Sequence, residues 1–228
     1  DLLATEYLRF WPKDRNAAAI RRIDGGHGGS RSASQVRALL YEGRWEEALD
    51  LLPETSREIL WRERAAGRCP ASLKTAERAM LYRLRTMTAS EFAVIPDCTE
   101  GLENRLVRAA GQAGSLEEFY ALAKSKRYAH ARIRRITLRA FLGITELPER
   151  VEYLRLLGAN ERGLALLREM KQKGNIPVLT KSAHGTALEG AAKRQFELAC
   201  RAENLWGLCL TRPLDAGWSF RSGPLILK

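Results

Sequence analysis

The sequence predicts a mainly α protein, in which a helical region follows the strand–loop–helix tail of an α/β core. Three observations lead to this prediction. Apolar residues recur at helical spacing almost continuously from about residue 55. A glycine-rich segment, DGGHGGSRS at 24–32, separates a short apolar-to-basic run from a serine-capped helical pattern. One further strand-like run, IPVLT, stands at 176–180.

The first part of the chain carries the pattern of an α/β unit. Residues 1–11 predict a short helix that Pro12 ends, and residues 17–23 are compatible with a strand. Helical patterns follow from Ser32 to about Gly43 and over 45–52. We therefore assign residues 1–53 to the C-terminal part of an α/β core. Because the chain does not begin with Met and its first helix has no cap, we expect a piece of a longer protein.

Residues 54–228 predict a second, helical domain with one short strand near 176–180. Two capping boxes mark helix starts, Thr88 with Glu91 and Ser115 with Glu118, where the hydroxyl accepts from an early amide and the carboxylate reaches back. We assign no structure after Trp206, because that stretch is rich in Gly, Pro and Trp. The expected helices are 55–66, 71–86, 88–94, 100–112, 115–124, 129–142, 147–157, 160–172 and 186–208.

Composition and charge narrow the class of protein. The 228 residues suffice for one large domain or two small ones, and 45% hydrophobic residues are too many for a disordered chain. Lys and Arg outnumber Asp and Glu by 38 to 27, which gives a net charge of +11. A GC-rich genome would account for the use of Arg in place of Lys among these basic residues. It would not account for the surplus of basic over acidic residues. The surplus therefore favours a polyanionic partner such as nucleic acid.

Other classes find little support. No apolar run is long enough to span a membrane, and no signal-peptide pattern opens the chain. Four scattered cysteines and three histidines lack the spacing of zinc ligands, so we expect no metal site and reduced thiols in a cytoplasmic protein. His27 stands alone in the glycine loop, and no complete catalytic signature is present.

The turn SASQVR at 32–37 is a candidate phosphate site. A helix that begins here presents free amides and a positive dipole end, with Ser32 or Ser34 as its cap. Arg37 lies one turn into the helix, and Arg21 and Arg22 stand on the preceding run. These groups could together hold an anion. The alternative is a serine-capped surface helix with solvated arginines.

The segment KSKRYAHARIRRITLR at 124–139, called the basic segment below, is a candidate RNA surface. Arg132, Arg135 and Arg139 share one helix face, and Tyr128 stands at the helix entrance, where it could stack on a base or fasten the turn. Like charges at this spacing repel each other unless an anion binds. Arg105 adds to the basic surface from the preceding helix. Alternatively, Glu100, Glu103, Glu117 or Glu118 neutralises this face in the fold. The basic residues of the segment are Lys124, Lys126, Arg127, Arg132, Arg134, Arg135 and Arg139.

Several segments together resemble the tRNA(Met) cytidine acetate ligases, a bacterial nucleotidyltransferase-like family. The most specific are EGLENRL at 100–106 and the KRYxxxRIRR pattern at 126–135. The resemblance extends over most of the chain through the segments EYLRF at 6–10, IRRIDGGHG at 20–28, SASQVR at 32–37, LRLLGANERGLALL at 154–167, NIPVLTK at 175–181 and ENLWGL at 203–208.

The resemblance implies a nucleotidyltransferase core that binds ATP together with Mg²⁺, and a helical C-terminal region. Such an enzyme activates acetate as acetyl-adenylate and acetylates N4 of the wobble cytidine of elongator tRNA(Met). The family's HxGH motif is absent, which is consistent with a chain that begins within the core. By resemblance, Arg22, Ser32, Ser34 and Arg37 match ATP contacts.

The family's basic motif matches Lys126, Arg127, Tyr128, Arg132 and Arg135, and charge and spacing assign these residues, with Arg105 and Arg139, to tRNA binding. Two other functions remain open from the sequence. One is a helical RNA-binding or scaffold module without catalysis, and the other is an adenylyltransferase with another substrate.

Overall fold

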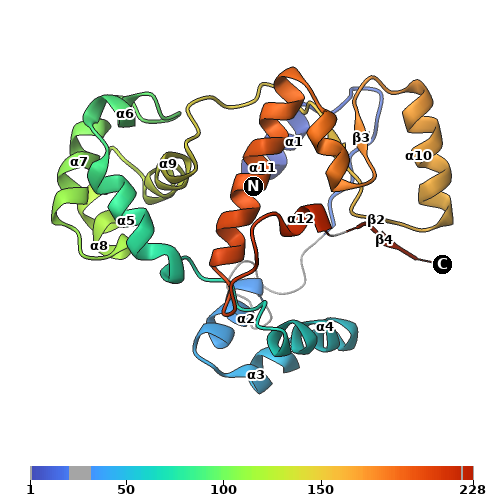
Figure 1. Cartoon of the computed structure of the whole chain (residues 1–228), viewed down its shortest axis with the longest axis horizontal. Helices are drawn as coiled ribbons and strands as arrows, with labels where there is room; N and C mark the ends of the chain where they lie inside the picture. The colour runs from blue at the N-terminus through green and yellow to red at the C-terminus, as the bar shows by residue number, and fades with distance from the viewer. Residues whose placement is uncertain (1, 21–31, 222, 228) are drawn as a thin grey trace. The chain divides into compact units, whose positions relative to one another are not determined.

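The computed structural model describes residues 2–20, 32–221 and 223–227 (Figure 1). Its contacts divide the chain into two compact units, Asp1–Trp61 and Arg62–Lys228. Helices dominate both units in the described residues, which confirms the mainly α prediction. The described strands are short and form two parallel pairs, β1 with β3 and β2 with β4.

The first unit contains α1 (Leu2–Arg9), α2 (Ala33–Tyr41), α3 (Trp45–Asp50) and the start of α4 (Glu54–Ala65). A tight turn joins α2 to α3, with Gly43 at φ +78°. Leu39 and Ala48 are the buried residues of this helix pair. The strand predicted over 17–23 does not form over 17–20, where the backbone is irregular and Ile20 is 97% exposed. A strand needs a pairing neighbour, and the described part of this unit holds no sheet.

A helical cluster forms the main core of the second unit. It comprises α5 (Glu77–Thr86), α6 (Ala89–Ala93), α7 (Leu102–Gln112), α8 (Leu116–Ala123) and α9 (His130–Leu142), preceded by the 3₁₀ turn η1 (Leu73–Ala76). Figure 1 shows these elements side by side at one end of the unit. Their apolar stripes meet at Met80, Phe92, Leu106, Phe119 and Ile136, all with exposed fractions of 0%. The five predicted helices between residues 71 and 142 are therefore confirmed, with ends shifted by a few residues.

Side-chain caps define where two of these helices begin. Thr88 accepts a hydrogen bond from the Glu91 amide, and the Glu91 carboxylate accepts from the Thr88 amide at 2.8 Å, which completes the predicted capping box. Ser115 likewise accepts from the Glu118 amide at 3.1 Å. The Glu118 carboxylate, however, accepts from the amide of Gly114, one residue before the cap, so the second box is displaced by one residue.

The segment after α9 differs from the prediction. The helix expected over 147–157 is absent, because this segment contributes β1 (Leu154–Arg155) to a parallel pair with β3 (Val178–Leu179). The Leu154 amide donates to the Pro177 carbonyl, and the Leu156 amide donates to the Leu179 carbonyl, both at 2.9 Å. The strand predicted near 176–180 is confirmed at its centre. Next come β2 (Gly158–Ala159), which pairs with β4 (Leu225–Ile226), and α10 (Glu161–Lys173).

The end of the second unit returns along a long helix. After the 3₁₀ turn η2 (Ser182–Ala187) comes α11 (Gly190–Leu208), and then α12 (Trp218–Arg221). The connecting segment, 209–217, lies against α11, where the Leu214 amide donates to the Gly207 carbonyl at 3.2 Å. Asn204 on α11 accepts from the Gly217 amide at 2.9 Å. The stretch to which the sequence assigned no structure is thus folded back onto the helix before it.

Candidate functional site

The N-terminus of α2 carries three of the four predicted ATP contacts. Ser32 is the cap residue, and its hydroxyl accepts from the Gln35 amide at 3.3 Å. The exposed Arg37 guanidinium donates to the Ser34 hydroxyl at 3.4 Å. Three side chains, of Ser32, Ser34 and Arg37, and the first amides of a nine-residue helix therefore lie together, as an anion site requires. Arg22 and His27 lie outside the described residues.

The α2 site fits a phosphate group in its chemistry. No ion pair of Arg37 with a carboxylate occurs among the described residues, whereas the nearby Arg44 is bound to both Glu47 and Glu42. Arg37 is thus a cation beside a helix N-terminus, and no carboxylate of the described residues neutralises it. A phosphate oxygen would supply the missing negative charge.

The basic segment meets an acidic loop in the structure. The loop at 94–101, between α6 and α7, places Asp97 and Glu100 in the left-handed region at φ +72° and +66°. Arg139 donates to the Asp97 carboxylate and to the Pro96 carbonyl, the latter at 2.9 Å. Arg132 donates to the Asp97 carbonyl and lies 3.5 Å from the Glu100 carboxylate. These two arginines fasten the loop onto α9.

This arrangement shifts the pKa values of two residues in the loop, Asp97 and Cys98. The Arg139 guanidinium lowers the pKa of Asp97 from its ordinary value by hydrogen bonding to the carboxylate, while partial burial opposes the shift and Arg135 adds to it. Neighbouring Cys98 is buried, and loss of hydration raises the pKa of its thiol to about 11. Glu100 is one of the acids that the sequence offers as a neutralising partner, whereas Asp97 is not among them.

The predicted RNA residues divide into two groups by exposure. Arg105 donates to the carbonyls of Leu122, Ala123 and Lys124 at the C-terminus of α8, and so closes that helix end. Tyr128 is only 8% exposed, and its hydroxyl donates to the Glu100 carbonyl at 2.6 Å. Together with Arg132 and Arg139, these residues hold structure within the cluster.

The remaining members of the basic segment face outward. Lys126 is exposed, and the side chains of Arg127 and Arg135 are 63% and 54% exposed. Arg127 lies 3.5 Å from Glu100, and Arg135 lies 3.6 Å from Asp97, so both pairs are long and solvated. Arg134 is also exposed, with its guanidinium carbon 6.0 Å from the centre of the Tyr120 ring. Lys124, Lys126, Arg127, Arg134 and Arg135, the exposed basic residues of the segment, outnumber the two loop acids Asp97 and Glu100, so this surface is positive.

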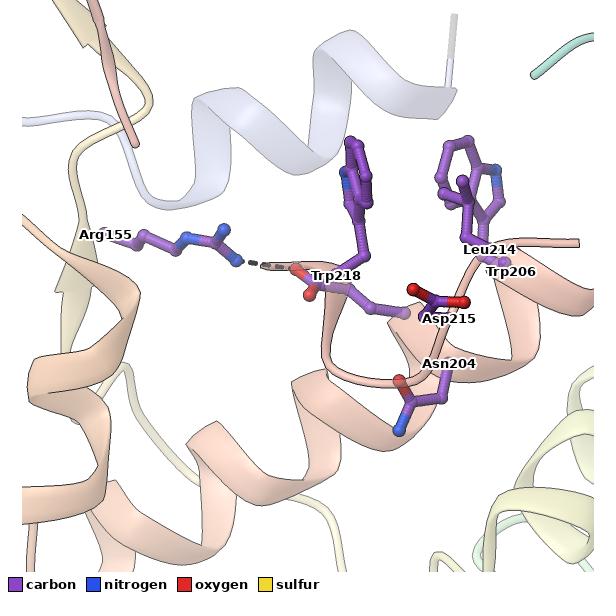
Figure 2. A pocket seen from close by; sticks show the side chains of 8 residues that line it. Arg155, Asn204, Trp206, Leu214, Asp215 and Trp218 are labelled. Atoms are coloured by element: carbon purple, nitrogen blue, oxygen red, sulfur yellow. Dashed lines mark hydrogen bonds and ion pairs between the residues drawn. The ribbon is translucent and has the colours of Figure 1, made fainter. Parts of the chain in front are cut away.

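The sequence reasoning missed a pocket of about 270 Å³ beside α11. Arg155 of β1 forms one end of it, through a 2.6 Å hydrogen bond to Glu203 of α11. Trp206 and Trp218 border the pocket, as Figure 2 shows, with exposed fractions of 48% and 44%. The signal in the sequence is the Trp-rich stretch after residue 205, which supplies both of these half-exposed indoles. We call this cavity the tryptophan pocket.

Neither a metal cluster nor a membrane-spanning helix occurs among the described residues. Within them, no three His, Cys, Asp or Glu side chains lie close enough together to hold a metal ion. The same part of the chain contains no helix that is both long and apolar enough to cross a membrane.

Comparison with known proteins defines the class of this chain. The sequence profile of the HIGH nucleotidyl transferase family matches residues 1–216, so the chain belongs to that family. Within it, the resemblance to the tRNA(Met) cytidine acetate ligases is confirmed. The ligase of Thermotoga petrophila is 37% identical over 196 residues, which make up 79% of this chain and 47% of the relative. That of Acetivibrio thermocellus is 29% identical, and its match covers 100% of this chain and 60% of the relative.

Solved structures agree. Thermotoga maritima TmcAL, bound with alpha-thio ATP, superposes with a TM-score of 0.77 at 30% identity, covering 86% of this chain and 51% of that one. The apo form gives a TM-score of 0.79 at 28% identity, covering 93% and 53%. The chain thus spans about half the length of the relatives that it matches. The fold is nucleotidyltransferase-like, as the sequence resemblance implied.

Proposed function

We propose that this chain forms part of an ATP-dependent ligase that activates acetate and acetylates N4 of the wobble cytidine of elongator tRNA(Met). The observation that carries the proposal is the similarity to TmcAL over 86% of the chain, in a complex with an ATP analogue. In the proposed reaction, an acetate oxygen attacks the α-phosphorus of ATP and pyrophosphate leaves. The cytidine N4 amine then attacks the acetyl carbon, AMP leaves, and N4 loses a proton.

In this proposal the N-terminus of α2 binds the ATP phosphates. Ser32, Ser34 and Arg37 surround that helix end, and Arg22 is assigned to the same site by resemblance. Negative charge increases on the phosphoryl oxygens as acetate attacks, and a guanidinium with free helix amides stabilises it without proton transfer. Mg²⁺ is part of the proposal through ATP, with no ligand assigned to this chain.

The outward-facing residues of the basic segment are the proposed tRNA contacts. Lys126, Arg127 and Arg135 present cations to solvent, and the Asp97 and Glu100 carboxylates engage the latter two at long distance. An RNA phosphate could therefore displace those carboxylates at little cost. Arg105, Tyr128, Arg132 and Arg139 act in this proposal by holding the surface in place. The proposal also places the protein in the cytoplasm, where tRNA modification takes place.

The ATP site is tested by binding of alpha-thio ATP to the wild-type chain and to Arg37→Ala. We expect the variant to weaken binding by about tenfold, because one charge-assisted contact is lost. Arg44→Ala is the matched control, since Arg44 is exposed on the same unit but is occupied by Glu42 and Glu47. Equal affinity in all three proteins would contradict the assignment.

The tRNA surface is tested by titration with unmodified elongator tRNA(Met) and a control tRNA at low and moderate salt. Replacing Arg127 and Arg135 with Glu should weaken binding and flatten its salt dependence, since fewer counterions are released. Detection of N4-acetylcytidine after incubation with ATP and acetate tests the whole reaction. Affinity that is unchanged at both salt concentrations would overturn this assignment. No observation favours the module without catalysis or the adenylyltransferase with another substrate.

A further inference from the structure

The tryptophan pocket is a built cavity whose walls come from distant parts of the chain. The Arg155–Glu203 hydrogen bond joins β1 to α11 at one end. Hydrogen bonds from the Leu214 amide to Gly207 and from the Gly217 amide to Asn204 fasten the opposite wall onto α11. The cavity is therefore framed by fixed backbone and not by a free loop.

Its aromatic side chains have the features of a stacking site. Figure 2 shows the Trp206 and Trp218 indoles projecting to the same side of the pocket. Large aromatic side chains are usually well covered, yet about half of each remains open to solvent. A planar ring could stack on the exposed part of either indole. The volume of about 270 Å³ lies just below the range of roughly 300–1,000 Å³ for drug-sized ligands, which favours a single base or nucleoside.

A polar group at the pocket's end is incompletely satisfied. One carboxylate oxygen of Glu203 accepts from Arg155, whereas the other, Oε2, is buried without a hydrogen-bond partner among the described residues. Buried oxygens normally have a donor. Because Glu203 lines the pocket and 39% of its side chain is exposed, a ligand seated there could reach this carboxylate. The ligand should therefore carry an N–H donor at the edge of its ring.

We propose that the tryptophan pocket binds an unstacked nucleobase with an exocyclic amino group, stacked on Trp206 or Trp218 and donating to Glu203. Carboxylates accept from the cytosine amino group, and enzymes that bind an extruded base combine such a contact with aromatic stacking. The base belongs to an RNA strand in this proposal, which in that respect rests on the proposed function. The exposed Arg212 lies two residues before the pocket-lining Leu214, and Arg221 on α12 donates to the exposed, pocket-lining Asp215 at 3.2 Å, a solvated pair that a flanking phosphate could displace.

Nuclear magnetic resonance of the indole N–H signals gives a direct test. Cytidine and adenosine should shift the signals of Trp206 and Trp218 and leave that of Trp61, an indole of similar exposure (47%) on α4, unchanged. Uridine should bind at least tenfold more weakly, because it has no exocyclic amino group and would place O4 against the Glu203 carboxylate. Absence of shifts at both pocket indoles with every nucleoside would overturn the proposal.

Variants separate stacking from amino recognition. Trp206→Ala or Trp218→Ala should weaken cytidine binding about tenfold, and Trp61→Ala should not. In Glu203→Gln the amide oxygen can still accept from Arg155 while the NH₂ replaces the acceptor, so the preference for cytidine over uridine should fall about tenfold. Thermal unfolding checks that each variant is folded. If Glu203→Gln does not fold, the variants of the half-exposed tryptophans still test the pocket.

Oligocytidylate distinguishes an RNA strand from a free nucleoside. Binding at least tenfold tighter than that of cytidine, and lost in Trp206→Ala, supports the strand, whereas equal affinity overturns the RNA part of the proposal. Tight tRNA binding that neither tryptophan variant changes overturns the pocket and leaves the proposed function intact. If tRNA does not bind but cytidine shifts the pocket indoles, the proposed function fails and the pocket stands.

Discussion

Arg139 on α9 donates to the carboxylate of Asp97, a residue held at φ +72° in the loop that leads into α7. The same guanidinium nitrogen donates to the carbonyl of Pro96. One side chain from a helix late in the cluster thereby fixes a loop of unfavourable backbone conformation between two earlier helices. This contact makes the basic segment a structural element as well as a charged surface.

Replacing Arg139 by Met should destabilise the second unit by about 1–3 kcal/mol, because the Asp97 carboxylate and the Pro96 carbonyl lose their donor. The Arg139 side chain is only 16% exposed, so water replaces it incompletely. Chemical denaturation measures the change. Arg134→Met on the same helix is the matched control, with an expected effect within about 0.5 kcal/mol because Arg134 is exposed. Equal losses in the two variants would contradict the role of Arg139.

The Asp97 carboxylate should make stability sensitive to acid. Its pKa is lowered in the folded chain, chiefly by Arg139, so its contribution is present above the unfolded pKa of about 3.9 and is lost as pH falls through the folded value. Asp97→Asn should therefore lose less stability than the wild type between about pH 6 and pH 3. In the Arg139→Met background, where only Arg135 still lowers the pKa of Asp97, the same substitution should change the acid dependence much less, and a change of full size there would refute the pairing.

A matched pair of glycines tests packing in the second unit. A Cβ atom at Gly185 would lie 2.2 Å from the ring of Phe196, which is itself buried against Tyr153 and Phe220. Gly185→Ala should cost about 1–3 kcal/mol through overpacking. Gly111 on α7 has open space around it, so Gly111→Ala should stabilise by about 0.5–1 kcal/mol through helix propensity. Melting temperatures that shift in the same direction in both variants, relative to the wild type, would contradict this account of the packing.

The four cysteines should react with a thiol reagent in two groups. Cys98 and Cys209 are buried and Cys69 and Cys200 are partly exposed. Burial raises the pKa of Cys98 to about 11, so little thiolate forms there near neutral pH. Peptide mass spectrometry after brief labelling should find Cys98 and Cys209 modified last. Labelling of Cys98 at the rate seen in denaturant would show that the helical cluster opens readily.

The sequence predicted what local chemistry determines. Ser32 as the cap of α2 and the Thr88–Glu91 box follow from residues three positions apart, and both occur in the structure. The helix predicted over 147–157 was wrong, since the backbone of Leu154 pairs with a strand more than twenty residues later, which no local periodicity reveals. The tryptophan pocket was missed for the same reason, because Arg155 and Glu203 meet only in the folded chain.

The basic segment shows the same limit of prediction from local sequence. Charge alone marked the basic segment as a binding face, but it could not separate Arg132 and Arg139, which hold the 94–101 loop, from the outward-facing Lys126 and Arg127. That separation depends on where Asp97 lies, and its position is set by a left-handed turn between other helices. The two domains and the individual site residues assigned from the sequence stay predictions.

The parallel pairing of β2 with β4 has a consequence for synthesis on the ribosome. Gly158 and Ala159 are translated well before their partners, Leu225 and Ile226. At about 5–20 residues per second, β2 waits for seconds with its edge unpaired, whereas the helices between residues 77 and 142 already have one another as neighbours, although α9 still lacks its contact with α11. An emerging chain would therefore be open to chaperones and to neighbouring nascent chains at β2 more than at the main core of the helical cluster.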